Sequence, residues 1–325
     1  MTLTWRRETW PIRGSFTISR GSRTATEVIV VEITAEGHRG WAECVPYARY
    51  GETLTSVGQQ IDDTKAAIEA GADRQALADL LPAGAARNAV DCALWDLAAK
   101  QAGVGAHVLA GVPPAVPVTT AFTLSLNTPE AMAAAAAEAR NRPLLKVKLG
   151  GTGDIERIQA VRHGAPESRL IVDANEGWTP DMLPTYLPAM AALGVEMIEQ
   201  PLPADDDQAL AELARDVAIC ADESFHVSDD LDGIVNRYDM VNIKLDKTGG
   251  LTEALAALQA ATDRGLGVMI GCMIGTSLAM APAVLLTAKA QFVDLDGPLL
   301  LAEDRDPGIR FDGSTLRPPS SAVWG

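Results

Sequence analysis

Acidic and basic residues stand at the ends of short apolar runs in the second half of the sequence. Asp173 ends LIVD, Glu199 ends EMIE and Asp222 follows AICA, while Lys148 and Lys244 end the runs before and after this group. Three carboxylates that meet at one place repel one another unless a cation lies among them. Oxygen ligands without His or Cys favour a hard cation, so the pattern predicts a Mg²⁺ site between two lysines.

A basic group on each side of a metal-bound carboxylate is what a 1,1-proton transfer requires. One lysine removes an α-proton from one face, the other delivers a proton to the opposite face, and the cation stabilises the enolate between the two steps. A lysine acts as a base only when it is neutral, so a neighbouring cation that lowers its pKa helps. Lys146 lies two residues before Lys148. It is therefore expected on the same face of the strand, as that cation and as a contact for the substrate carboxylate.

These residues belong to a series of eight short β-rich runs that alternate with Ala- and Leu-rich runs. Their polar ends follow one another at steps of 22 to 27 residues, which is room for one strand, one helix and two loops, and they are Thr123, Lys148, Asp173, Glu199, Asp222, Lys244, Gly271 and Asp294. The series predicts an α/β fold, a (β/α)8-type TIM barrel, whose active site lies at the carboxyl ends of its strands. Lys148 and Lys244 are four steps apart in a ring of eight, so they should face each other.

The alternative without catalysis is that a single Asp or Lys at a strand end is solvated, or that an Asp there caps the next helix. Five such residues at successive spacing are hard to explain in that way. Asp294 and Asp296, at i and i+2 on the eighth run, suit a substrate ammonium, although a solvated acidic turn explains them almost as well. Cys272 could line the pocket, but no histidine partner for a thiol nucleophile is evident.

The N-terminal part of the chain differs in pattern and predicts an α+β capping domain. It has β-rich runs at Thr26–Thr34 and His38–Glu43, joined across Glu36-Gly37, and helical runs at about Thr53–Ala70 and Ala85–Gln101. The stiff run Gly111–Pro117 marks a boundary. We expect a capping domain over residues 1–113, a barrel over 114–298, and a segment over 299–325 that returns to the capping domain.

Helix boundaries can also be predicted inside the barrel. Thr128 followed by Pro129 is typical of a helix start, and Gly265 can end a helix over Leu251–Arg264. Pro184 and Pro188 lie within another helical run, so that helix should be broken or kinked.

The composition narrows the class of partner. The 325 residues include 43 Asp and Glu against 27 Lys and Arg, a net charge of −16, which argues against nucleic acid and anionic membranes as partners. The N-terminus lacks the apolar segment of a signal peptide, and the four cysteines have no CxxC spacing. A cytoplasmic protein that binds a small molecule is therefore expected. The sequence leaves a homo-oligomer open.

Five motifs resemble those of the muconate-lactonizing subgroup of the enolase superfamily: Lys146-x-Lys148, Asp173-Ala-Asn175, Glu199-Gln-Pro201, Asp222-Glu-Ser224 and Asn242-Ile-Lys244. Five longer stretches are similar to bacterial L-Ala-D/L-Glu epimerases: Asn242–Ala254, Gly271–Ser277, Asp294–Pro298, Pro46–Gly51 and Leu81–Asn88. The resemblance covers essentially the whole chain. It implies a modified (β/α)7β barrel with an N-terminal capping domain.

The resemblance also implies roles for individual residues. Lys148 and Lys244 would be the acid/base pair, and Asp173, Glu199 and Asp222 would hold Mg²⁺. Asp294 and Asp296 would bind the amino terminus of a dipeptide. Thr123, Lys146 and Cys272 would lie against the substrate. Two loops of the capping domain, at about Gly14–Thr26 and Tyr47–Glu52, would close over the barrel, and either Arg20 or Arg23 would bind a glutamate side chain.

The prediction is thus a Mg²⁺-dependent dipeptide epimerase, with murein-peptide breakdown as the process that the resemblance implies. The same enolate would also serve N-acylamino acid racemisation, cycloisomerisation or o-succinylbenzoate synthesis, but none of these substrates needs Asp294 and Asp296. A Schiff-base lyase would leave the three carboxylates unexplained. A non-catalytic barrel should have lost some of the acid/base lysines and metal-binding carboxylates, and here all of them are present.

Overall fold

A computed structural model describes all residues 1–325 and contains an eight-stranded parallel barrel. Its strands follow in chain order: β5 (Phe122–Leu124), β6 (Leu144–Lys148), β7 (Arg169–Asp173), β8 (Val195–Glu199), β9 (Ala218–Ala221), β10 (Met240–Ile243), β11 (Gly267–Ile270) and β12 (Phe292–Val293). A hydrogen bond from Ala121 N to Val293 O, 2.7 Å, joins the first and last strands. Every strand ends within one residue of the polar position predicted for it, and the predicted barrel is confirmed.

An apolar layer fills the end of the barrel where the strands begin. It is made of small and medium side chains from all eight strands or the residues beside them: Ala121, Leu144, Ile171, Met197, Cys220, Met240, Met269 and Phe292. Alternation along each strand places these side chains inside, below the polar residues at the strand ends. The floor of the barrel is therefore solid, and the polar chemistry lies at its other end.

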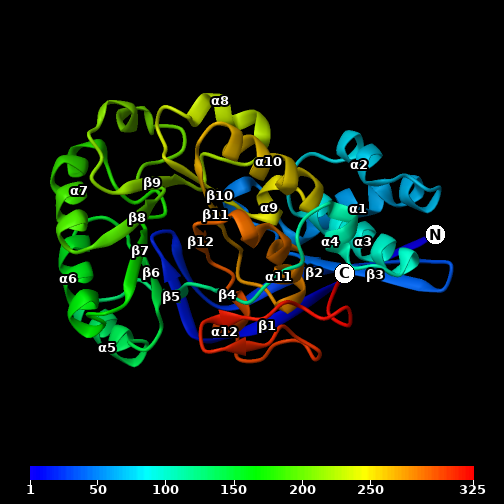
Figure 1. Ribbon diagram of the computed structural model, residues 1–325, viewed down its shortest axis with the longest axis horizontal. Helices are drawn as coiled ribbons and strands as arrows, with labels where there is room; N and C mark the ends of the chain where they lie inside the picture. The colour runs from blue at the N-terminus through cyan, green and yellow to red at the C-terminus, as the bar shows by residue number, and fades with distance from the viewer.

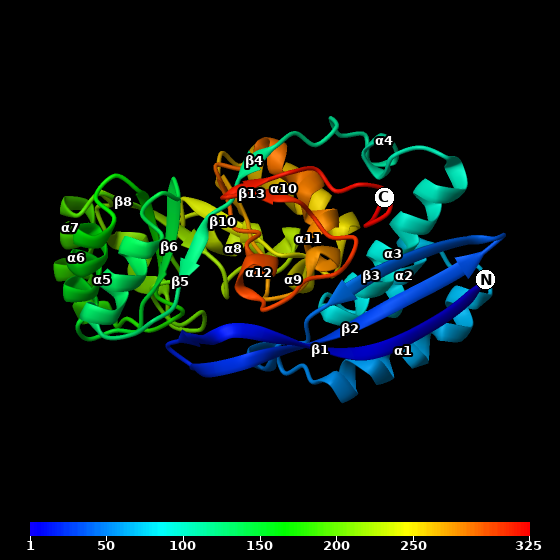
Figure 2. The ribbon, with the colours of Figure 1, turned by 90° about the horizontal axis from the view of Figure 1, so that it is seen from below.

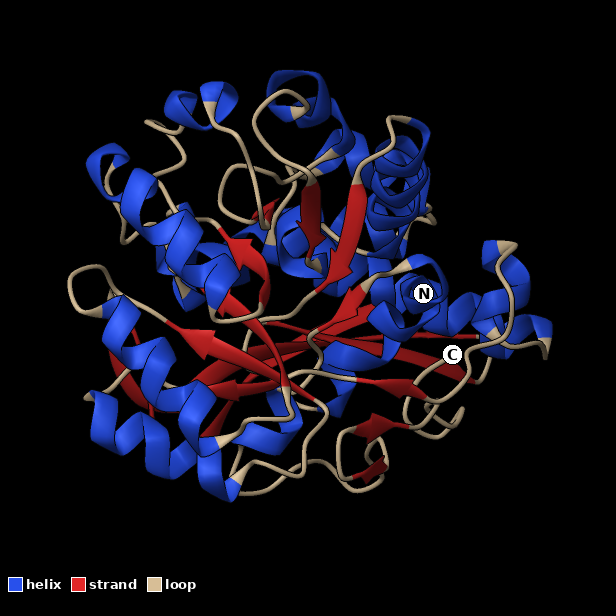
Figure 3. Cartoon of the chain, turned by 60° about the vertical axis from the view of Figure 1, so that its left-hand side comes forward, coloured by secondary structure: helices blue, strands red, loops and turns tan.

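Helices cover the outside of the strands over much of the circumference (Figure 3). They are α5 (Pro129–Glu138), α6 (Asp154–Gly164), α7 (Leu183–Ala192), α8 (Leu231–Ile234), α9 (Leu245–Thr248), α10 (Leu251–Asp263) and α11 (Ser277–Ala283), with 3₁₀ turns η2 (Pro180–Met182), η3 (Gln208–Glu212), η4 (Ser228–Asp230) and η5 (Val284–Lys289). Only the single turn α12 (Gly297–Leu300) follows β12. The fold is therefore the modified (β/α)7β form.

The helix boundaries test the predictions made from Thr, Gly and Pro. Thr128 accepts a hydrogen bond from Ala131 N and Pro129 begins α5, while Gly265, at φ +73°, follows the end of α10. A break at Pro188 does not occur, because α7 continues through it, and a kink there stays a prediction. Pro184 lies in the first turn of α7, where its missing N–H needs no partner, and burial of the opposite face holds the helix across Pro188.

The capping domain has an antiparallel sheet of β1 (Thr2–Ile18), β2 (Gly21–Ala35) and β3 (His38–Cys44). Helices α1 (Leu54–Glu69) and α3 (Ala85–Ala102) pack on this sheet, and α2 (Arg74–Leu80) and the short α4 (Ala106–Ala110) pack against α3. Glu36 and Gly37 both have positive φ in the β2–β3 turn, as a tight hairpin requires. The β1–β2 hairpin extends from this domain along the barrel (Figure 2). The 3₁₀ turn η1 (Ala48–Tyr50) forms the second loop beside it.

The C-terminal segment returns to the capping domain, where the chain ends near β3 and α4 (Figure 1). It first forms β13 (Phe311–Asp312) and β14 (Thr315–Leu316), which pair with β4 (Val118–Thr119). Trp324 Nε1 then donates to Cys92 O at 3.1 Å, and Gly325 N donates to Asp96 Oδ1 at 2.7 Å. Both acceptors are on α3. No helix of the chain is both long and apolar enough to cross a bilayer.

Candidate active site

Strand register places the predicted residues side by side at the carboxyl end of the barrel. Lys148 on β6 pairs with Asp173 on β7, which pairs with Glu199 on β8. Asp222 and Lys244 directly follow β9 and β10. Paired residues of parallel strands point to the same side, so all five side chains face inward. None of them is more than 9% exposed.

Lysines and carboxylates form a buried network there, which we call the inner cluster: Lys146, Lys148, Lys244, Lys247, Asp173, Glu199, Asp222 and Asp294. Lys148 Nζ lies 2.5 Å from Asp173 Oδ2. Lys146 Nζ lies 2.6 Å from Glu199 Oε2 and 2.7 Å from Asp294 Oδ2. The four positive and four negative groups balance one another formally, so the cluster can be buried without a large net charge.

Asp222 is held from two sides. Lys244 Nζ donates to its Oδ2 at 2.6 Å, and Lys247 Nζ donates to its Oδ1 and to its backbone oxygen, both at 2.6 Å. Burial opposes the charge of Asp222, but the two lysines outweigh burial and hold the pKa of this carboxyl well below its usual range. Burial also opposes the charge of Lys244, yet Asp222 and Glu199 raise the pKa of this ammonium. In this conformation Lys244 is an acid rather than a base.

Glu199 is the least neutralised carboxylate of the cluster. Burial and the neighbouring charges of Asp173 and Asp222 raise its pKa, whereas burial is outweighed at Asp173 by Lys148 and Lys146, which lower the pKa to about 2. Glu199 Oε1 accepts from Asn242 Nδ2 at 2.7 Å, but Oε2 is buried without an aligned hydrogen-bond donor. A divalent cation between these strands would relieve that imbalance.

The donor set therefore has the chemistry of a hard-cation site, with three carboxylates on neighbouring strands. Each carboxylate nevertheless faces a lysine in this conformation. No three acidic, histidine or cysteine side chains are already arranged as a metal cage. The residues fit a cation by type and position, and they would have to turn from the lysines to hold one.

Lys148 and Lys244 both line a cavity of about 60 Å³ between the barrel and the capping domain. Three strands separate β6 from β10 in either direction around the barrel. Phe16 and Ile18 of β1, with Met273 and Ile274 after β11, line the same cavity with apolar surface. The two ammonium groups thus line one small cavity from opposite sides of the barrel.

The residues after β12 lie beside this space. Asp294 accepts from Lys146, and Asp296 Oδ2 accepts from Thr123 N at 2.7 Å. Burial and Asp294 together raise the pKa of Asp296 to about 7. Cys272 lines the cavity, and burial raises the pKa of its thiol, which argues against a thiolate nucleophile. The structure thus brings these predicted residues to the same end of the barrel. Asp294 already forms an ion pair with Lys146 there.

The two arginines proposed for a substrate side chain have different surroundings. Arg20 donates to Glu223 Oε1 at 2.7 Å and to Tyr47 Oη at 3.0 Å, and it also contacts Glu176. Arg23 forms no hydrogen bond or ion pair, and its guanidinium lies 5.9 Å from the ring centre of Tyr47. Both line the cavity. The guanidinium of Arg20 is therefore already paired with protein side chains, whereas the guanidinium of Arg23 is free to bind a ligand.

Sequence reasoning missed Asn242, Lys247 and Glu223. Asn242 lies two residues before Lys244, so period-two alternation on β10 could have placed it on the inner face. Lys247 lies on α9 after the strand, and only the turn of the chain brings it to Asp222. Glu223 adjoins Asp222 and reaches the cavity lined by the arginines.

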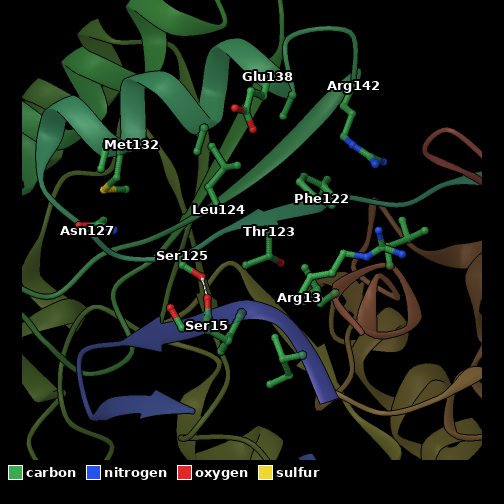
Figure 4. A pocket seen from close by; sticks show the side chains of 17 residues that line it. Arg13, Ser15, Phe122, Thr123, Leu124, Ser125, Asn127, Met132, Glu138 and Arg142 are labelled. Carbon is green, nitrogen blue, oxygen red and sulfur yellow. Dashed lines mark hydrogen bonds between the residues drawn. The ribbon is translucent and has the colours of Figure 1, made fainter. Parts of the chain in front are cut away.

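A larger hollow lies outside the barrel, between β1, β5, α5 and α12 (Figure 4). Its volume is about 360 Å³, and Phe122 and Leu124 point into it toward α5, while Thr123 points the other way. Ser125 Oγ contacts Ser15 O at 3.4 Å across its edge. Apart from Thr123, none of the predicted site residues lines it. Lys148, Asp222 and Lys244 instead line the smaller cavity at the strand ends.

Comparison with known proteins gives matches over nearly the whole chain. It is 47% identical over 311 residues to the L-Ala-D/L-Glu epimerase of Escherichia coli (strain K12), covering 95% of this chain and 97% of that protein. It is 44% identical to an N-acetyl-D-glutamate racemase of a Pseudoalteromonas species, covering 92% and 95%. Both relatives are isomerases by name.

A solved structure is also similar. An enolase family member from Agrobacterium tumefaciens, with homology to dipeptide epimerases and with bound sodium and L-Ala-L-Glu, superposes with a TM-score of 0.98 at 51% identity over 99% of both chains. Residues 1–111 match the mandelate racemase / muconate lactonizing enzyme N-terminal domain, and residues 130–319 match the enolase C-terminal domain-like family. The chain therefore belongs to the mandelate racemase / muconate lactonizing enzyme family of the enolase superfamily.

Proposed function

We propose that this protein is a Mg²⁺-dependent dipeptide epimerase that inverts the α-carbon of the C-terminal residue in L-Ala-L-Glu and its L-Ala-D-Glu epimer. The observation that carries the proposal is the pair of lysines, Lys148 and Lys244, on opposite sides of one cavity beside carboxylates from three neighbouring strands. The similarity to the Escherichia coli epimerase and to the Agrobacterium tumefaciens structure with L-Ala-L-Glu supports the choice of substrate.

In this proposal Asp173, Glu199 and Asp222 hold the cation. Bound Mg²⁺ would polarise the substrate carboxylate and stabilise the enolate charge. Lys146 would give up its ion pairs to contact the same carboxylate. If Asp173 and Asp222 turned to the cation, they would no longer pair with Lys148 and Lys244. Lys244 would then lose the Asp222 charge that raises its pKa, and one lysine of the pair would act as the neutral base. The other lysine, on the opposite side of the cavity, would then deliver a proton to the other face of the substrate α-carbon.

The remaining predicted residues would orient the two ends of the substrate. Asp294 and Asp296 would bind the ammonium group, with Thr123 and Cys272 beside them. We assign the glutamate side chain to Arg23 rather than Arg20, because Arg23 has no protein partner and lines the cavity. The positive and negative groups of the inner cluster balance one another, so a bound divalent cation would leave excess positive charge unless the substrate carries carboxylates.

Racemisation of N-acetylglutamate is the second candidate, because the chain is 44% identical to a racemase of that name. The two substrates share the glutamate α-carbon and side chain, but N-acetylglutamate has no ammonium group. Two buried carboxylates at the amino end disfavour a neutral acetyl group there. Asp294 and Asp296 therefore favour the dipeptide.

Proton NMR in D₂O tests the proposal directly. L-Ala-L-Glu and N-acetyl-L-glutamate are each incubated with the protein and Mg²⁺, and with protein after EDTA. We expect loss of the glutamate α-proton signal and appearance of the diastereomer for the dipeptide only, and only with metal. Exchange of N-acetylglutamate at a higher kcat/KM would favour the racemase, and no exchange of either would refute both.

We further propose that the protein works in the cytoplasm on a small-molecule substrate. All four cysteines are unpaired, and three of them are buried, as is usual in a reducing compartment. We keep residues 1–113, 114–298 and 299–325 as the proposed domain division. The cavity would then lie between the first two units.

A further inference from the structure

A second group of paired charges lies at the mouth of the barrel, above the inner cluster. It consists of Arg20 and Arg49 from the two loops of the capping domain, and Glu176 and Glu223 from the segments that follow β7 and β9; we call it the outer network. Arg20 Nη2 lies 2.7 Å from Glu223 Oε1, and Arg20 Nη1 lies 3.1 Å from Glu176 Oε2. Arg49 donates to both oxygens of Glu176 at 2.7 Å. Each carboxylate therefore links the barrel to the capping domain.

Glu223 forms its only ion pair with Arg20. Its side chain is 1% exposed, and Oε2 has no hydrogen-bond donor. A carboxylate buried beside Asp222 is costly without a counter-charge. Arg20 reaches it from the β1–β2 turn, 203 residues away in the sequence. The attraction between Arg20 and the buried carboxylate of Glu223 thus holds the tip of the hairpin against the barrel.

The turn after β7 is shaped to receive the same hairpin. Asn175 and Glu176 both have positive φ, at 46° and 65°, which is unfavourable for residues other than glycine. This conformation presents Asn175 O to Ser19 Oγ at 2.8 Å and to Arg20 Nη1 at 2.9 Å. Backbone strain of this kind is retained where it positions functional groups.

Arg20 and Arg23 belong to one hairpin but have different tasks. Thr17 pairs with Ser22 and Ile18 with Gly21, so Ser19 and Arg20 form the two-residue turn. Arg23 pairs with Phe16 on the adjoining strand. Because the turn has only two residues and Arg23 lies in the paired strand, holding Arg20 at the tip also restrains Arg23 over the cavity. Arg20 further donates to Tyr47 Oη, which ties the second loop to the first.

We propose that Arg20 is a positioning residue, whose ion pair with Glu223 holds the β1–β2 hairpin over the cavity and thereby presents Arg23 to the side-chain carboxylate of the substrate. The identity of that substrate rests on the proposed function, whereas the latching of the hairpin does not. Arginine suits this task because it is permanently charged and contacts two carboxylates at once through its planar group.

Hydrogen–deuterium exchange of the protein without substrate tests the latch. Arg20→Gln and Glu223→Gln should each speed amide exchange in residues 14–26, and Arg20→Lys should have an intermediate effect. The double variant should be no worse than the single ones, because both remove the same contact. Arg169→Gln breaks a matched ion pair to Glu196, with a side chain 52% exposed on the barrel, and should leave residues 14–26 unchanged. Unchanged exchange in every Arg20 and Glu223 variant would refute the latch.

Steady-state kinetics with L-Ala-L-Glu test the link to Arg23. Arg20→Gln should raise KM about 10- to 100-fold, as for loss of a hydrogen bond to a charged group, with a smaller change in kcat. Arg23→Gln should raise KM similarly but leave hydrogen exchange in residues 14–26 unchanged. Equal KM values for Arg20→Gln and wild type would refute the positioning role. If the wild-type protein has no activity on this dipeptide, the proposed function fails, and the exchange experiment still decides the latch.

Discussion

The inner cluster and the outer network are two sets of paired charges at the same end of the barrel, but they are built from different cations. The inner cluster uses four lysines with side chains 0–9% exposed. The outer network uses two arginines that are 26% and 36% exposed. Lysine can lose its proton when its surroundings change, whereas arginine stays charged at any relevant pH. The two lysines proposed to exchange protons therefore belong to the inner cluster, and the arginine proposed to hold the hairpin belongs to the outer network.

Removing either lysine of the proposed acid/base pair should have the largest effect. Lys148→Ala or Lys244→Ala should lower the epimerisation rate by at least about 10²- to 10⁴-fold, the contribution usual for general acid–base groups. The rate is followed by proton NMR of L-Ala-L-Glu in D₂O. Lys65→Ala, whose side chain is 40% exposed, is the control. Near wild-type epimerisation by either single variant would show that the reaction does not use two bases.

Neutralising an inner carboxylate should weaken metal binding. Asp173→Asn or Asp222→Asn should raise the Kd for Mn²⁺ by more than the roughly 10- to 100-fold typical of residues that only support metal ligands. Electron paramagnetic resonance of free Mn²⁺ measures this affinity without relying on activity. Asp181→Asn changes an exposed carboxylate and should leave the Kd unchanged. An unaltered Kd in the inner variants would remove the carboxylates from the metal site.

The amino-end carboxylates predict a pH dependence. Asp296 has a pKa of about 7, raised by burial and by Asp294. It is neutral below that pH and negative above it, so affinity for an ammonium group should rise with pH. We expect kcat/KM for L-Ala-L-Glu to increase severalfold from pH 6 to pH 8, and Asp296→Asn to be slower and flatter over this range. Asp232→Asn, at a side chain 82% exposed, should keep the wild-type profile. A steep profile in Asp296→Asn would assign the dependence to another group.

The smallest expected effect is the loss of folding stability when an ion pair of the outer network is removed. Arg49→Gln should lower the free energy of unfolding by less than about 1 kcal/mol, because a partly exposed ion pair is screened by water. Lys146→Met should cost about 3–5 kcal/mol, since it leaves buried carboxylates without their counter-charge. Urea unfolding of the two variants beside wild type measures both values. Equal losses would mean that the two networks do not differ in energy as they differ in burial.

Much of the site could be predicted because its signals are local. Spacing and alternation placed seven polar residues and Gly271 at the ends of eight strands, and β6, β7 and β8 end at Lys148, Asp173 and Glu199. Hairpin and capping signals at Glu36-Gly37 and Thr128 were equally reliable, since they depend on a few adjacent residues. A break at Pro188 does not occur, because burial along α7 outweighed the lost hydrogen bond.

The sequence by itself determined which chemical groups the barrel presents and which strand end carries each of them. Only the tertiary structure decided their partners: Lys247 reached Asp222, Arg20 bound Glu223 across 203 residues, and Arg23 stayed free. The physical reason is that side-chain direction repeats with the local period of a strand. Ion pairing instead depends on which distant segments fold against each other and on how burial redistributes charge between them.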